Sequence, residues 1–145
     1  MNRRGFTLVE VIVVISLLTI LLAMATPSMI AWRENARNKE IAREVLGGLR
    51  QARSIAVTEG QTVTFTLNPG TRQMTFSTVT RQLPAGVSIR ARAADSGNWT
   101  TGNSDVEVEF ASQGNASTLY QVQVNEEDRL TVRIESTASG LARID

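Results

Sequence analysis

A single carboxylate lies inside the most apolar segment of the chain. Glu10 is the only charged residue between Phe6 and Thr26. An acid within a membrane-spanning helix costs up to roughly 2.5–3.5 kcal/mol, and it therefore indicates a functional site with a partner. If the chain were cut between Gly5 and Phe6, the new α-amino group would lie four residues from Glu10. The two groups could pair where the dielectric constant is low, and between chains the pair would set the register of packed helices.

The other residue types offer little enzymatic chemistry. The chain has 145 residues with neither Cys nor His, which excludes disulfides, thiolate metal sites and the commonest general base. It has no phosphate-binding glycine loop and no nucleophile–base motif. We therefore predict no enzymatic activity, no cofactor and no metal site. The acidic turn Glu126-Glu127-Asp128 could hold Ca²⁺ through oxygen ligands, but a single charged turn beside Arg129 is more often only solvated.

The apolar segment that carries Glu10 has the length of a membrane span. As a helix, residues 6–26 would be about 31 Å long, and the hydrocarbon core of a bilayer is about 30 Å thick. Arg3 and Arg4 precede the segment, so the positive-inside rule places the amino terminus in the cytoplasm and the rest of the chain outside it. A cleaved signal peptide, with a small-residue site at Ala23-Met24-Ala25, and a plain anchor are alternatives. The carboxylate of Glu10 argues against both.

An amphipathic helical pattern follows Pro27. Apolar residues recur at the spacing of one helix face, at Ile41, Val45, Leu49, Ala52 and Ala56. The charged residues between them, Arg50 and Arg53 included, read as a solvated face. Gly47-Gly48 permits close approach of another backbone, and Gly60 fits a C-terminal cap. We expect a nearly continuous helix from residue 6 to about residue 58, with Pro27 as its bend or, alternatively, as its end.

From Gln61 onward the apolar residues recur with a period of two, which predicts strands. About seven such runs occur, at residues 63–67, 74–76, 87–91, 106–110, 119–124, 130–134 and 141–144. Turn signals such as Asn68-Pro69-Gly70 separate them, and residues 94–104 read as a polar loop. One long helix before these strands predicts an α+β fold with an antiparallel sheet or two packed sheets.

The amino-terminal residues also carry a family resemblance. The run from Arg3 to Glu10, followed by the apolar segment and Pro27, resembles the class III signal of type IV pilins and type II secretion pseudopilins. The resemblance implies that a prepilin peptidase cleaves between Gly5 and Phe6 and methylates the amino group of Phe6. It also implies that Glu10 is needed for docking into a growing filament and that Pro27 kinks the helix.

A second resemblance concerns the rest of the chain. Residues 52–56 with Gly60 and Val63, and the stretches 108–114 and 134–143, look like parts of the GspH/FimT minor pseudopilins and pilins. On this basis we expect a leader (1–5), a transmembrane and filament-core helix (6–31), an amphipathic helix (32–60) and a β-rich head (61–145) of pilin-like fold. The resemblance implies a minor subunit near the tip of a type II secretion pseudopilus or a type IV pilus.

The partners and the location follow from the same resemblance. They are the prepilin peptidase, other pilin-like subunits through the N-terminal helix, the inner-membrane assembly platform and, before assembly, membrane lipid. The subunit would sit in the bacterial inner membrane, with its head in the periplasm, and would then enter the filament.

DNA binding is an alternative function. Of the 15 basic residues only one is Lys, and arginine suits bidentate contacts with phosphate. Arg90 and Arg92 share a strand face, while Arg129, Arg133 and Arg143 gather toward the carboxyl end. Some FimT-like minor pilins are implicated in DNA uptake through basic residues near that end, which Arg143 resembles. With a net charge of only +1, ion pairs with nearby acids are the simpler interpretation. A secreted β domain is the third alternative.

Overall fold

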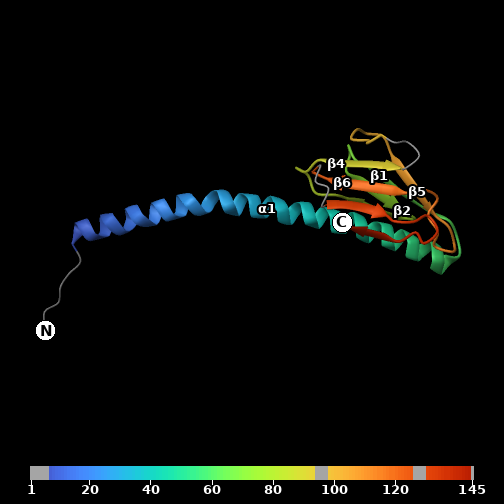
Figure 1. The fold of residues 1–145 in the computed structure, drawn as a ribbon, viewed down its shortest axis with the longest axis horizontal. Coiled ribbons are helices and arrows are strands. Elements are labelled where there is room, and N and C mark those ends of the chain that lie inside the picture. The colour runs from blue at the N-terminus through green and yellow to red at the C-terminus, as the bar shows by residue number, and fades with distance from the viewer. Residues whose placement is uncertain (1–6, 94–97, 126–129, 145) are drawn as a thin grey trace. The chain divides into compact units, whose positions relative to one another are not determined.

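The computed structural model describes residues 7–93, 98–125 and 130–144, without the side chains of residues 24–28, 30 and 31. In this part of the chain one helix, α1 (Leu8–Glu59), precedes eight strands (Figure 1). The strands are β1 (Val63–Asn68), β2 (Gln73–Phe76), β3 (Val79–Gln82), β4 (Ile89–Ala93), β5 (Val106–Phe110), β6 (Tyr120–Val124), β7 (Thr131–Ile134) and β8 (Ala142–Ile144). Contacts divide the chain into two compact units, Met1–Ala36 and Arg37–Asp145.

The first unit consists of the amino-terminal part of α1. The helix continues on both sides of Pro27 as one element, so the alternative that Pro27 ends the helix is wrong. The bend at Pro27 stays a prediction. Every described side chain of this unit is exposed, and the unit therefore has no core of its own.

The second unit contains the amphipathic part of α1, and its predicted apolar face is confirmed. All five residues expected on that face, from Ile41 to Ala56, are fully buried. Gly48 is buried with them, and a Cβ atom there would lie 3.0 Å from Cε2 of Phe65. The three nearest atoms belong to the side chains of Phe65, Met74 and Phe76, so side chains, and not the predicted second backbone, approach Gly48 closely. Gly47 has nothing within 4 Å of such an atom. The helix ends at Glu59, and Gly60 follows with a positive φ of 67° as expected for a cap.

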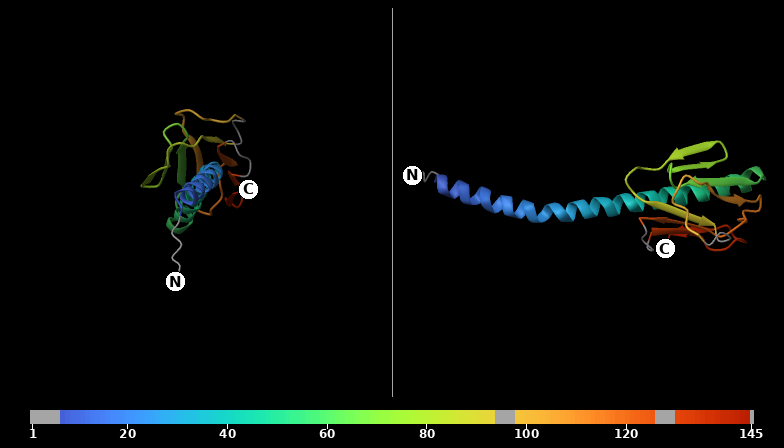
Figure 2. Two further views of the ribbon diagram at one scale, coloured as in Figure 1. Left: turned by 90° about the vertical axis from the view of Figure 1, so that its left-hand side faces the viewer. Right: turned by 90° about the horizontal axis from the view of Figure 1, so that it is seen from above.

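Two four-stranded antiparallel sheets pack on this part of α1. Sheet I has the strand order β3-β2-β1-β5, and sheet II has the order β4-β6-β7-β8. In the right-hand view of Figure 2, the hairpin β2–β3 and the strands β7 and β8 lie to either side of the helix. The α+β fold predicted from the sequence, a helix packed on antiparallel sheet, is confirmed.

Strand β3 was not expected from the sequence. Its four residues, Val79–Gln82, include one apolar side chain, and the other three are exposed. An edge strand with little buried surface leaves no period-two signal. With β3, eight strands are described where about seven were predicted, and the strand expected from Val87 begins instead at Ile89.

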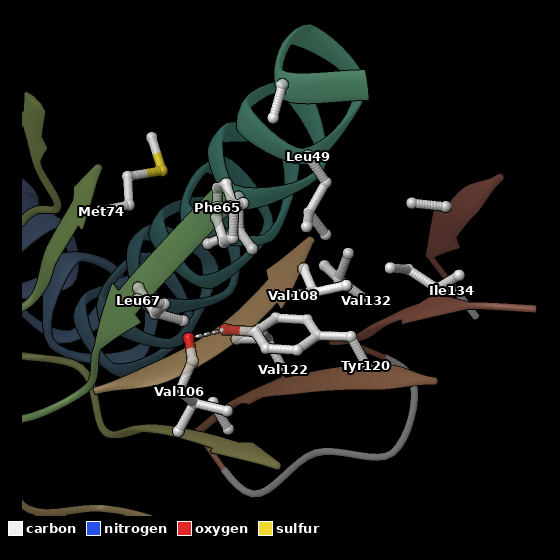
Figure 3. Packing of buried hydrophobic residues seen from close by; sticks show 14 of the residues in the cluster. Leu49, Phe65, Leu67, Met74, Val106, Val108, Tyr120, Val122, Val132 and Ile134 are labelled. Atoms are coloured by element: carbon white, nitrogen blue, oxygen red, sulfur yellow. Dashed lines mark hydrogen bonds between the residues drawn. The ribbon is translucent and has the colours of Figure 1, made fainter. Parts of the chain in front are cut away.

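The core of the second unit is aromatic where the two sheets meet (Figure 3). The rings of Phe65 in sheet I and Tyr120 in sheet II meet edge to face with centroids 6.0 Å apart, and Phe65 stacks on Phe76 at the same centroid distance. The Tyr120 hydroxyl donates a hydrogen bond of 3.1 Å to the carbonyl of Val106 in β5. Burial of the ring, together with the nearby charge of Glu107, raises the pKa of Tyr120 well above its ordinary value. The ring thus links the sheets by packing and by one buried polar bond.

Candidate functional sites: the helix start and an arginine face

The start of α1 is built by Thr7 and Glu10. The hydroxyl oxygen of Thr7 accepts a hydrogen bond of 3.2 Å from the backbone N–H of Glu10. Ser or Thr followed three residues later by Glu is the pattern of a helix capping box, and a carboxylate in the first turn also faces the positive end of the helix dipole. The sequence contains this pattern, so the capping arrangement could have been found there. Glu10 therefore favours formation of the helix in addition to any contact with another chain.

Other polar side chains in the apolar part of the helix bond to their own backbone. The hydroxyls of Ser16 and Thr19 each donate a 2.8 Å hydrogen bond to the carbonyl oxygen four residues earlier. Such bonds satisfy a hydroxyl inside an apolar medium. The Glu10 carboxylate has no side-chain hydrogen bond and no ion pair within the described residues. Among the described polar side chains of this segment, the Glu10 carboxylate is thus the one that stays available to a partner outside the chain.

The predicted cleavage site, Gly5 and Phe6, lies outside the described residues. The described residues begin with Thr7 and the capped first turn of α1. From Leu8 to Leu22, twelve large hydrophobic side chains are between 47% and 77% exposed. Among the helices formed by the described residues, none is long and apolar enough to cross a membrane.

A second candidate site lies on the outer face of sheet II. Every second side chain of a strand points to this face, and the strand register aligns these side chains in rows across the sheet. Arg92 lies opposite Gln121, Gln121 opposite Arg133, and Arg133 opposite Arg143. The set is called the arginine face below, and it comprises Arg90, Arg92, Trp99, Gln121, Gln123, Arg133 and Arg143.

Glutamine and tryptophan side chains hold two of these arginines in place. Nε of Arg90 donates to Oε1 of Gln123 at 2.6 Å. Nε and Nη2 of Arg92 donate to Oε1 of Gln121 at 2.9 and 2.7 Å. Both guanidinium groups also lie over the ring of Trp99, 4.8 and 4.5 Å from its centroid, at distances where the cation attracts the aromatic face. Within the described residues neither guanidinium meets a carboxylate, so their positive charges are oriented without being neutralised.

The structure brings together two of the three arginines predicted as a DNA contact. Arg133 and Arg143 lie directly opposite each other on β7 and β8. Arg143 donates a hydrogen bond of 2.7 Å through Nε to Glu135, which is the pairing with a nearby acid that the simpler interpretation expected. Arg129 and the acidic turn 126–128 lie outside the described residues. In the part that is described, no three acidic side chains come together as a metal-ligand group.

Arg53 has a role that the sequence did not indicate. It was expected on a solvated helix face, but the structure places it half-buried, and its Nε donates to the carbonyls of Gly114 and Ser139, each at 3.0 Å. Gly114 and Gly140 have φ angles of 84° and 58°. A Cβ atom on Gly140 would overlap the Gly114 carbonyl oxygen. Arg53 thus joins α1 to two turns that are distant in the sequence, and only their glycines hinted at tight turns.

Two protein families match this chain. Residues 1–26 match the prokaryotic N-terminal methylation motif, and residues 42–140 match the family described as type II transport protein GspH. Since the second match covers more than half of the chain, the chain belongs to the GspH family. This family comprises minor pseudopilins and pilins of type II secretion and type IV pili, as the sequence resemblance implied.

Solved structures with a similar fold come from both kinds of machine. One is the minor pseudopilin EpsH from the type 2 secretion system of Vibrio cholerae, with a TM-score of 0.61, 15% identity, and coverage of 74% of this chain and 94% of that chain. Another is the type IV minor pilin FimU of Pseudomonas aeruginosa, with a TM-score of 0.56, 14% identity, and coverage of 77% and 90%. Among curated protein sequences, none matches this chain significantly. The structural likeness confirms the predicted pilin-like fold.

Proposed function

We propose that this chain is a minor subunit of a type II secretion pseudopilus or a type IV pilus, placed at or near the filament tip after a prepilin peptidase cleaves it between Gly5 and Phe6. The observation that carries the proposal is the exposed apolar part of α1. Twelve large hydrophobic side chains there are exposed, whereas a folded chain in water buries such residues. Lipid or the helices of other subunits are the surroundings that would cover them.

The same segment can serve in both surroundings. Lipid tails and the interior of a helix bundle are similarly apolar, so helices leave one for the other without a large change in hydrophobic free energy. Ser16 and Thr19 are already satisfied by their own backbone. Before assembly, the subunit sits in the inner membrane with its head in the periplasm, next to the assembly platform.

Glu10 supplies the directional contact between subunits. After cleavage, the methylated amino group of Phe6 on the same or a neighbouring chain is the cation that pairs with its carboxylate. An ion pair in low dielectric is strong and depends steeply on distance, and it therefore fixes how far one helix slides along the next. The absence of a partner for Glu10 among the described residues supports this role.

The test replaces Glu10 by Leu in the full chain, with Thr19→Val as the matched control in the same helix. We expect both variants to insert and to be processed, and only Glu10→Leu to lose incorporation into filaments. Mass spectrometry of the mature chain should show methylated Phe6 at its start. Normal incorporation of Glu10→Leu would refute the register role, and a mature chain that starts near Thr26 would indicate a secreted domain instead.

DNA capture is the second candidate function. The observation in its favour is the row of Arg92, Arg133 and Arg143 across sheet II. Guanidinium groups suit phosphate, but Arg143 is already paired with Glu135. Electrophoretic shifts of DNA with the wild-type chain and with Arg143→Ala test this function. Salt-sensitive binding near physiological ionic strength that weakens in the variant would support it, and absence of such binding excludes it.

A further inference from the structure

We propose that the arginine face of one head binds the carboxylates of strand β5 on the head of a second copy of this chain. The proposal rests on the proposed function, because it names the contact between heads once the N-terminal helices are packed together. It joins two surfaces of opposite charge that the same head carries on different sheets. Each is described in turn below by its donors and acceptors.

The basic surface offers two preoriented cations at a fixed spacing. Arg90 and Arg92 are two residues apart on β4 and point to the same face of sheet II, which places their Cα atoms roughly 6.6–6.8 Å apart along the strand. Both guanidinium groups lie over the ring of Trp99. A guanidinium has five N–H donors, and the bonds to Gln123 and Gln121 use one donor of Arg90 and two of Arg92. Further donors on each group stay available for a planar carboxylate.

The acidic surface has the same spacing. Asp105, Glu107 and Glu109 alternate with buried residues at β5, and all three are exposed. Asp105 accepts a hydrogen bond of 2.8 Å from Asn68, and Glu107 accepts one of 3.3 Å from Thr66. In the described part of the chain these three carboxylates form no ion pair. A carboxylate every second residue matches a guanidinium every second residue on an extended strand.

The backbone edges of both strands are covered in part, which favours a contact through side chains. Thr100 exchanges hydrogen bonds of 3.0 and 2.8 Å with Ala91 of β4. Ser117 donates its backbone N–H to the carbonyl of Glu109 in β5 at 2.8 Å. Pairing of β4 or β5 with a strand of another chain would need these groups. These bonds in the middle of β4 and at the end of β5 would interrupt an added strand, and they favour docking of charged faces.

A carboxylate-bearing strand suits the arginine face better than a nucleic acid does. Strands β4 and β5 contact each other within one head, so a long polyanion laid over Arg90 and Arg92 would run beside the acids of β5. A short strand that carries its own alternating carboxylates can be positioned to avoid that repulsion. Because the basic and acidic surfaces are different patches, the contact is heterologous. In a filament it joins two copies of this minor subunit only where they lie next to each other.

Cross-linking between full-length chains in detergent micelles tests the proposal, because the chain has no natural Cys. One cysteine is introduced as Ser88→Cys, two residues before Arg90 and beside the arginine face. The other is introduced as Thr64→Cys, opposite Glu109 in sheet I. A short bismaleimide joins the two thiols when the charged surfaces meet. The matched control is Thr80→Cys, which is exposed on the far edge strand β3 of the same sheet.

We expect the mixture of Ser88→Cys and Thr64→Cys chains to give about fivefold more cross-linked dimer than the mixture with Thr80→Cys, the size of effect that two exposed ion pairs allow. The excess should vanish in about 1 M salt, where charges are screened beyond about 3 Å. Glu107→Gln with Glu109→Gln, both exposed and removable without loss of core, should abolish it. Reversal of both pairs, as Arg90→Glu and Arg92→Glu against Glu107→Arg and Glu109→Arg, should restore it.

Three results would overturn the proposal. One is a yield equal to that of the Thr80→Cys control, and another is a yield that the glutamine substitutions leave unchanged. The third is salt-sensitive binding of a labelled oligonucleotide to the arginine face, together with a cross-link yield that the β5 substitutions do not change. Each of these leaves the proposed function intact, because incorporation through Glu10 and the N-terminal helix is measured separately.

Discussion

The only tyrosine of this protein should resist ionisation until the head unfolds. Tyr120 is fully buried, and its hydroxyl donates to the carbonyl of Val106. Burial and the charge of Glu107 raise its pKa in the folded state, whereas in the unfolded chain it titrates near 10. Below about pH 10 both states hold the proton, and the stability is unaffected. At higher pH only the unfolded state loses the proton, so stability falls as pH rises.

The size of the effect follows from the linkage between proton binding and folding. Each pH unit above the pKa of the unfolded state costs at most about 1.4 kcal/mol, and by pH 11 the accumulated loss is about 1.4 kcal/mol. For a domain of about 100 residues this lowers the melting temperature by about 5–10 °C. Tyr120→Phe removes this loss but leaves the carbonyl of Val106 without its donor, which costs about 1–2 kcal/mol at neutral pH.

The assay follows tyrosinate absorbance and far-ultraviolet circular dichroism together, on the segment from Arg37 to Asp145, which contains the described hydrophobic core. We expect the absorbance to rise only with loss of β structure. The Tyr120→Phe variant should be less stable than wild type at pH 7 and should lose less stability between pH 9 and pH 11. Ionisation near pH 10 in protein that is still folded would show that the ring is not sealed in the core, and the reasoning would be wrong.

Three further predictions concern single residues of the helix and the turns. Gly140→Ala should destabilise the head by about 3 kcal/mol or more in chemical denaturation, because a side chain there has a left-handed φ and overlaps the Gly114 carbonyl; a melting curve equal to wild type would contradict it. Gly47→Ala should raise the free energy of unfolding of the head by about 0.5–1 kcal/mol, whereas Gly48→Leu should lower it by about 1–3 kcal/mol. Equal effects of the two substitutions would show that only helix propensity matters at these positions. Thr7→Ala should cost the helix start about 1 kcal/mol, seen as faster amide exchange in the first turn, and unchanged exchange would exclude the cap.

Periodicity predicted the parts of the fold in which one face is buried. The helix face from Ile41 to Ala56 and the strands β1, β5 and β7 are amphipathic, so their apolar residues recur at the period of their backbone. Strand β3 was not predicted because it buries little side-chain surface and has no apolar period. The assignment of strands to two sheets could not be predicted either, because β1 pairs with β5 and β4 with β6, which are not consecutive strands. The apolar pattern of one strand gives no information about which strand it pairs with.

The candidate sites divide in the same way. Glu10 could be predicted from the sequence because apolar spans normally contain no charged residue. Its capping contact with Thr7 is equally local and could have been read from four residues. The arginine face and the Arg53 bonds depend on the register between strands and on turns 61 and 86 residues away from Arg53. Such distances are set by tertiary packing, and spacing along the chain does not encode them.

The edge strands of the two sheets bear on how subunits can be crowded together. Thr100 covers the edge of β4 at Ala91, and Ser117 covers the end of β5 at Glu109. Strand β3 is polar, and β8 is only three residues long. Short, charged or covered edge strands are the devices by which proteins resist amyloid-like stacking. Heads that are crowded side by side are therefore expected to remain individually folded.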